Sequence, residues 1–330
     1  MPGKRSFDDQ LAALEALRQG PASSAVVPLR KALGHRNNFV VAKAADLVRE
    51  FSLAELTPDL LIAFDRFFTD AVKSDPQCWA KNALSRALAA LEHQDAAVFL
   101  RGMRHIQLEP VWGGRSDTAG TLRATCALAL VQCRSLSESE LLNHLIELFA
   151  DEDKSVRVEA ARAVEQVGSP SAAALLRLRA VLSATQKNDE PEVLGACFGG
   201  VLRIEGRSAI PWISRFLAAG DDIAAEAALA LAADRSPEAF FALHKRFEEG
   251  PSADAWFLSV LFSAIALTRQ PEAQGFLLQL VRDESLHAEP AIEAILRAGP
   301  SDDVIHTLEQ AVAGNQRLAR VVAANKPVSS

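Results

Sequence analysis

The chain has 330 residues, of which 49% are hydrophobic and 23% are charged, so its composition is that of a globular protein rather than a disordered one. With 35 Lys and Arg against 42 Asp and Glu, the formal net charge is −7, which argues against a dedicated nucleic-acid binder. Tyrosine is absent, and alanine and leucine, which favour helices, dominate. These features predict an all-α protein.

The N-terminal segment predicts a helical cap and no export signal. It lacks the apolar core of a signal peptide, and Asp8 and Asp9 follow the first basic residues directly. Ser6 to Asp9 resembles a capping box with aspartate in place of glutamate, so residues 1–34 are expected to form capping helices. The sequence holds no apolar run of about 18 residues, and its four cysteines form no C-x-x-C pair. We therefore expect a cytoplasmic protein with reduced thiols and no membrane span.

A helix–turn–helix unit repeats along the chain. Its small central position recurs every 28 to 42 residues, at Ala44, Asn82, Ala124, Ala160, Ala196, Ala227, Ser263 and Ala291. The second helix of a pair often begins with a proline after a capping residue, as at Thr57-Pro58, Ser169-Pro170, Ser236-Pro237 and Gln270-Pro271. Repeats of this length predict stacked helix pairs. We expect one α-solenoid of about eight antiparallel pairs over 35–314, followed by a flexible tail over 315–330.

The clearest unit runs from Asp153 to Gly168. Val156, Ala160 and Val164 lie on one face of a predicted helix, and Gly168 ends it. Its pattern D-x-x-V-R-x-x-A-A-x-A-V resembles the HEAT-repeat signature, in particular the phycobilisome-lyase-type HEAT-like repeats. The resemblance implies that the first helix of each pair lines the concave side of a solenoid and the second helix its convex side.

The largest departure from the repeat length falls on residues 107–120, which we expect to form a loop. Trp112 stands beside two glycines, and Arg115 and Asp117 follow. Tryptophan and arginine are the residues most enriched at binding hot spots, so this loop is a candidate binding site. The alternative is that Trp112 fills the core between two repeats while Ser116 or Asp117 caps the next helix.

The predicted first helices carry a basic stripe in the N-terminal half of the chain. With the loop, it gives the candidate binding residues Arg36, Lys43, Lys81, Trp112, Arg115, Asp117, Arg123 and Arg157. The C-terminal half is acidic at corresponding positions, including Asp222 and Glu226. Opposite charges at the two ends of a groove would orient a partner. The alternative is ordinary solvated helix faces, with Asp46 and Glu50 offsetting part of the stripe.

Catalytic signatures are not evident. The seven histidines show no H-x-x-x-H spacing, no His-Glu dipeptide occurs, and neither a phosphate-binding loop nor a nucleophile elbow is present. We therefore expect a non-enzymatic scaffold without cofactor or metal, which binds a protein or peptide partner on its concave surface. The alternatives are a bilin lyase-like protein that handles a chromophore, a nucleic-acid-binding HEAT-like protein, and an enzyme whose site is dispersed along the chain.

Overall fold

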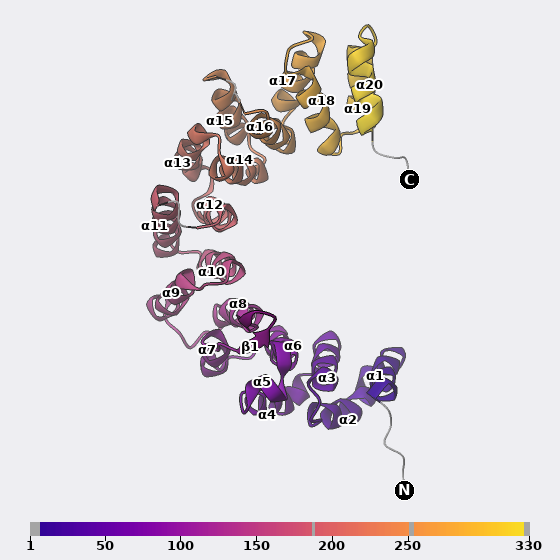
Figure 1. The fold of residues 1–330 in the computed structure, drawn as a ribbon, viewed down its shortest axis with the longest axis vertical. Coiled ribbons are helices and arrows are strands. Elements are labelled where there is room, and N and C mark those ends of the chain that lie inside the picture. Colours follow the sequence, from indigo (N-terminus) through magenta and orange to yellow (C-terminus); the bar gives the residue numbers. More distant parts are fainter. Residues whose placement is uncertain (1–6, 187–188, 251–253, 327–330) are drawn as a thin grey trace. The chain divides into compact units, whose positions relative to one another are not determined.

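The computed structural model describes residues 7–186, 189–250 and 254–326. These residues form helices and a single two-stranded hairpin, which confirms the all-α class (Figure 1). The chain divides into two compact units, residues 1–167 and residues 168–330. We call them unit 1 and unit 2.

Unit 1 has two layers of helices. One layer, called here the first-helix layer, contains α1, α3, α6, α8 and α10, and successive members from α3 onward pack on each other (Figure 1). The second helices α2, α4, α7 and α9 lie outside it. The bounds are α1 Phe7–Glu15, α2 Ala22–Leu33, α3 Asn38–Glu50, α4 Thr57–Arg66, α5 Ala71–Ser74, α6 Trp79–Ala90, α7 Ala96–Met103, β1 Leu108–Val111, β2 Gly114–Asp117, α8 Gly120–Leu130, α9 Glu138–Glu147 and α10 Lys154–Val167.

Unit 2 repeats this plan. Its first helices α12, α14, α16, α18 and α20 pack in sequence order, and each second helix contacts the first helix beside it. The bounds are α11 Pro170–Gln186, α12 Pro191–Glu205, α13 Ile210–Ser214, α14 Asp222–Asp234, α15 Pro237–Glu248, α16 Ala255–Leu267, α17 Pro271–Arg282, α18 Ala288–Arg297, α19 Asp302–Val312 and α20 Gln316–Asn325. Short 3-10 turns extend several of these helices.

The small residues of the repeat bring helices close together. The eight predicted positions fall in α3, α6, α8, α10, α12, α14, α16 and α18, and Ala44, Ala160 and Ala291 have no exposed surface. Gly102 of α7 shows how tight such a contact is, because a Cβ atom there would lie 2.4 Å from Sγ of Cys126 on α8. The core therefore runs between the layers of each unit.

The predicted helix starts are confirmed. Helices α11, α15 and α17 begin at proline, and α4 has proline as its second residue. Ser169 and Ser236 cap their helices, with their hydroxyls accepting from Ala172 N–H at 3.1 Å and from Ala239 N–H at 3.2 Å. These side chains satisfy donors that a helix N-terminus leaves open. The capping box expected at Ser6 lies outside the described residues.

Two predicted segments differ from the structure. Residues 108–117, expected as a loop, form the antiparallel hairpin β1–β2. Residues 316–325, expected within a flexible tail, form α20 instead. Asn315 caps this helix, and Leu318 and Val322 are buried in its contact with α18. Arg317 also pairs with Glu289 of α18 at 3.4 Å, so apolar and charged contacts together dock the segment.

The four cysteines are buried free thiols. Burial raises the pKa of Cys78 to about 11, and it also raises the pKa values of Cys126 and Cys197. None of the helices in the described residues is both long enough and apolar enough to cross a bilayer.

Candidate functional site

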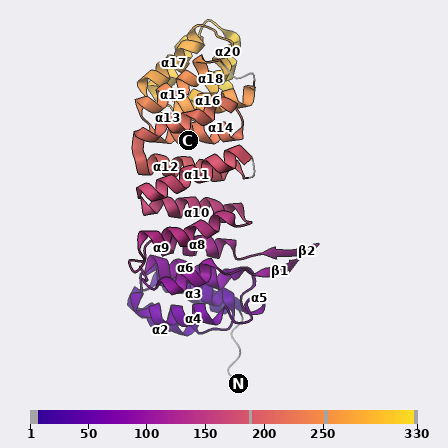
Figure 2. The same ribbon diagram turned by 90° about the vertical axis from the view of Figure 1, so that its left-hand side faces the viewer.

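The hairpin is the most unusual feature of unit 1, because it projects away from the helices (Figure 2). Val111 and Gly114 close it around the two-residue turn Trp112-Gly113. Gly113 has a φ of +88°, a conformation that side chains with a Cβ rarely adopt. The turn leaves Trp112 fully exposed, with a relative exposure of 103%. Trp112 therefore does not fill the core, as the alternative interpretation of this segment held.

The hairpin is held at its base by Glu109, whose carboxylate turns inward. Its Oε1 accepts from Gln77 N–H at 2.5 Å, from Gln107 Nε2 at 2.7 Å and from the Thr118 hydroxyl at 2.7 Å. Burial opposes ionisation of this carboxyl, but the three donors outweigh it and lower the pKa of Glu109. Gln107 also donates to the Asp75 carbonyl at 2.9 Å, which ties the hairpin to the segment before α6.

A second carboxylate closes the other side of the base. Asp117 accepts from the backbone N–H groups of Gln107 at 2.9 Å and Ala119 at 3.0 Å, and from Arg123 Nη1 at 2.5 Å. Burial again opposes ionisation, and these hydrogen bonds outweigh it, so the pKa of Asp117 is lowered. Arg123 continues to Asp151 through a bidentate pair at 2.7 and 2.8 Å. The hairpin is thus connected to the chain before α10.

Beneath the hairpin lies the fully buried ion pair between Asp75 and Lys81, whose side chains both have 0% exposure. The ammonium lies 3.0 Å from Oδ2 of Asp75 and donates to the Phe67 carbonyl at 3.2 Å. The carboxylate also accepts from the N–H groups of Ala80 and Lys81, at 2.8 and 3.0 Å, and from Asn38 Nδ2 at 3.0 Å. A buried pair is tolerated when its remaining hydrogen-bonding capacity is filled in this way.

The backbone around this pair is bent to fit it. Gln77 and Cys78 are consecutive and both have positive φ, at +58° and +54°. This conformation is uncommon for residues other than glycine. It turns the chain so that the Asp75 carboxylate meets the first N–H groups of α6, while Gln77 N–H faces Glu109. We call Asp75, Lys81, Glu109, Asp117 and Arg123, with their partners, the anchor network.

Three exposed rings lie in a row across the first-helix layer of unit 1. Phe7, Phe39 and Trp79 are exposed by 43%, 44% and 48%. Their ring centroids are 6.4 Å apart between Phe7 and Phe39 and 5.4 Å apart between Phe39 and Trp79. We call these rings the aromatic row. It crosses α1, α3 and α6 near their N-terminal ends.

The aromatic row and the hairpin lie at the same edge of unit 1. Asn38 at the start of α3 donates to Asp75, and Gln77 before α6 donates to Glu109 in β1. The segments that lead into α3, α6 and α8 are therefore side by side. We call these segments together with the first residues of α3 and α6, residues 34–39, 71–79 and 104–119, the helix-start edge.

The predicted basic stripe is largely neutralised. Lys81, Arg123 and Arg157 are buried, so they cannot contact a partner as the stripe required. Arg157 donates to the carbonyl groups of Asp151 and Glu152. Lys43 pairs with Glu15. The reason is that each of these cations reaches an acidic or carbonyl group from a neighbouring segment, which sequence order alone did not indicate.

Of the predicted binding residues, three are exposed at the helix-start edge: Arg36, Trp112 and Arg115. Asp117 is half-buried in the anchor network instead of facing a partner. Sequence reasoning missed Phe39 and Trp79. Their signal was a large aromatic residue at the second position of α3 and at the first position of α6.

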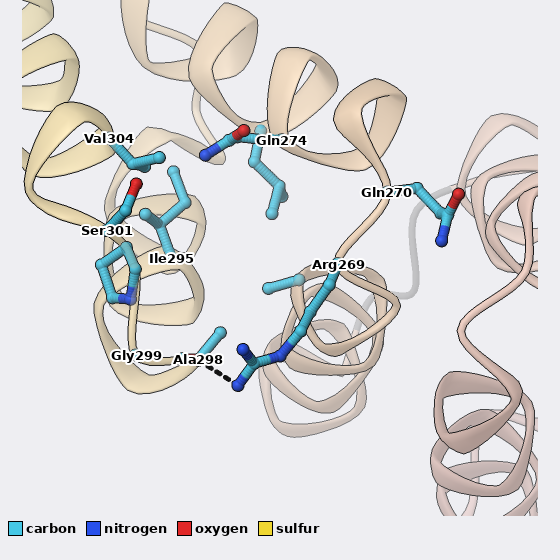
Figure 3. Close-up of a pocket in the computed structure, with 11 residues that line it drawn as sticks. Arg269, Gln270, Gln274, Ile295, Ala298, Gly299, Ser301 and Val304 are labelled. Atoms are coloured by element: carbon cyan, nitrogen blue, oxygen red, sulfur yellow. Dashed lines mark hydrogen bonds between the residues drawn. The ribbon is translucent and has the colours of Figure 1, made fainter.

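The described part of unit 2 has at least three recesses, and two of them carry polar groups of interest. The first lies among α16, α17, α18 and α19 and is lined by Gln274, Ser301 and Arg269 (Figure 3). Arg269 donates to the Ala298 carbonyl at 3.3 Å, so its guanidinium holds the α18–α19 turn. Among the lining residues, all of them described, no nucleophile stands beside a base.

The second recess of unit 2 lies on α12, α14 and α16, where Glu192, Asp222, Glu226 and Trp256 line it. Burial raises the pKa of Glu226, and the neighbouring Glu192 and Asp222 raise it further. Within the described residues, no three His, Cys, Asp or Glu side chains are arranged to hold a metal ion. This recess is therefore an acidic surface depression.

No known protein family matches this chain, and no curated protein matches it.

Proposed function

We propose that this chain is a non-enzymatic helical-repeat scaffold that binds a partner protein or peptide through the first-helix layer of unit 1 and its hairpin. The observation that carries the proposal is the outward exposure of Phe39, Trp79 and Trp112 at one edge. Leaving apolar surface in water instead of burying it costs roughly 25 cal/mol of free energy per Å². A contiguous exposed aromatic surface is typical of interaction sites. The anchor network supports the same role, because it fixes the hairpin that presents Trp112.

The repeat architecture supports a HEAT-like α-solenoid as the framework of this scaffold. First helices pack on first helices in each unit, and the chain returns to the same layer at each of the predicted small positions. Helix pairs that contact only their neighbours produce an extended surface suited to a helix or an extended peptide. The signature from Asp153 to Val164 agrees with this assignment.

The test is native mass spectrometry of the tagged protein purified from its own source, with an absorbance scan. We expect a stoichiometric protein partner with the natural chain and its loss with F39A/W79A. The control is F241A, which removes a ring of α15 that is 57% exposed in unit 2. Circular dichroism checks that each variant keeps its helices. A bare monomer, a bound pigment or nucleic acid, or a partner retained by F39A/W79A would contradict the proposal.

A further inference from the structure

The exposed cations of the helix-start edge differ from those elsewhere on the first-helix layer. On that layer Arg86 pairs with Asp46, and Lys43 pairs with Glu15. Arg18, in the 3-10 turn that follows α1, pairs with Glu50 of α3. Arg36, Lys73 and Arg115 are exposed, and their side chains make no ion pair or hydrogen bond with any residue in the described part of the chain. The edge therefore presents three positive charges that the chain does not neutralise.

Each free cation accompanies an exposed ring. Arg36 precedes Phe39 by three residues, Lys73 precedes Trp79 by six, and Arg115 follows Trp112 by three. The hydrogen bonds from Asn38 to Asp75 and from Gln77 to Glu109 hold the three segments side by side. The edge thus repeats one combination, a ring with an unpaired cation, over three successive helix pairs.

We infer that the helix-start edge of unit 1 binds an extended acidic segment of a partner protein, whose apolar side chains contact the rings while its carboxylates meet Arg36, Lys73 and Arg115. This inference rests on the proposed function and names the chemistry of the partner. Neighbouring helices are about 8–10 Å apart, so three of them span roughly 20 Å. An extended chain covers that distance in about six residues.

Single-stranded nucleic acid also combines phosphates with stacking bases, but the surface fits it less well. A strand carries one charge about every 3.4 Å and is bound in a continuous basic groove. Here three cations are spread over three helix pairs, the other cations of the layer are paired or buried, and the chain has a net charge of −7. Three widely spaced cations, each with a ring nearby in the sequence, fit single carboxylates along an extended peptide better than a continuous row of phosphates.

The experiment is selection of a random peptide library, about twelve residues long, on the full-length protein. We expect the recovered peptides to be enriched in Asp and Glu together with Leu, Phe or Trp. One of them, labelled with fluorescein, should bind at least about 10-fold more weakly to R36E/K73E/R115E than to the natural chain, and its binding should weaken with added salt. These side chains have no partners among the described residues, so the variant should unfold at the same urea concentration.

The matched control is R134E/R215E/R282E, which changes the net charge equally at exposed arginines away from this edge. It should bind the peptide as the natural chain does. Enrichment of neutral or basic peptides, or of none, would overturn the inference. So would binding of a labelled oligothymidylate that the first variant abolishes. Either result leaves the proposed function to be judged by the partner that co-purifies with the natural protein, so the two failures are distinguishable.

Discussion

Unit 1 and unit 2 use the same helix pairs but treat their aromatic and charged residues differently. In unit 2, Phe198, Trp212 and Phe216 contact one another within a helix pair, with centroids 4.7 to 5.9 Å apart. In unit 1, Phe39 and Trp79 lie half exposed, while the side chains of Lys81 and Asp75 are fully buried. Unit 1 therefore combines a fully buried ion pair with exposed rings that contact one another, and we attribute the cost of burying these charges to fixing the hairpin.

The largest effect that would sharpen this comparison is expected at the buried ion pair. K81M leaves the Asp75 carboxylate buried without its counter-charge, and we expect a loss of about 3–5 kcal/mol in unfolding free energy. Urea unfolding followed by circular dichroism measures it. R297M breaks an exposed pair with Glu293 in unit 2 and should cost no more than about 1 kcal/mol. If K81M and R297M lowered the unfolding free energy equally, the buried pair of the anchor network would stabilise unit 1 no more than an exposed ion pair does.

The next effect concerns the base of the hairpin. E109A leaves Gln77 N–H without its acceptor and removes the shorter of the two hydrogen bonds of the Thr118 hydroxyl, which should cost about 1–3 kcal/mol. The same change should release the hairpin, so limited proteolysis should cut between β1 and β2 much faster than in the natural chain. S116A alters the exposed residue opposite Glu109 and serves as the control. A hairpin that stays protected in E109A would show that Asp117 and Arg123 hold it unaided.

Substitutions at the tip of the hairpin should weaken binding and leave the stability of the fold almost unchanged. W112A/R115A removes two exposed side chains, so unfolding should change by less than about 0.5 kcal/mol. Binding of the co-purifying partner should weaken at least about 10-fold, because truncating a hot-spot residue costs about 2 kcal/mol or more. Calorimetric titration against that partner, with thermal unfolding alongside, gives both values. If the double variant melts instead, the tip belongs to the core.

The smallest expected effect is an opposite response of the two units to acid. Because the pKa of Asp117 is lowered in the folded chain, its ionised carboxylate contributes to the free energy of unfolding above its pKa in the unfolded chain, about 3.9. This contribution is lost as pH falls through the pKa of the folded chain. The raised pKa of Glu226 has the reverse sign, because its stabilisation is complete below about 4.3 and is lost as pH rises through the folded value.

Urea unfolding of E226Q and D117N over a pH series tests these signs. At neutral pH, E226Q should be slightly more stable than the natural chain and D117N less stable. Both differences should shrink on acidification, and that of E226Q should shrink first because the pKa of Glu226 is the higher one. A stability of E226Q below that of the natural chain at neutral pH would refute the sign for Glu226.

The repeats could be predicted because they follow local rules. Small residues at helical spacing and proline after a capping residue correctly located helices such as α10, α11 and α15. The hairpin was missed because only Glu109 of its eight strand residues is buried, which leaves no alternating pattern. A glycine in a two-residue turn was the one available sign.

The candidate binding surface was predicted less well than the helices. Trp112 and Arg115 were located from the break in the repeat, whereas Lys81 looked like a surface cation because its helical position faces the expected groove. Its partner Asp75 is only six residues away, but the pair forms because Gln77 and Cys78 adopt positive φ. Nothing in the types of those two residues indicates that backbone conformation.

The buried thiols give the molecule a set of built-in reporters. Cys78, Cys126 and Cys133 lie in unit 1 and Cys197 in unit 2, and all four are covered in the native chain. An alkylating reagent reacts with thiolates, so each cysteine can be modified only when its own helix pair opens. The rate at which each cysteine is labelled, measured by mass spectrometry of peptides, therefore reports how often its part of the repeat array opens locally. No engineered probe is needed.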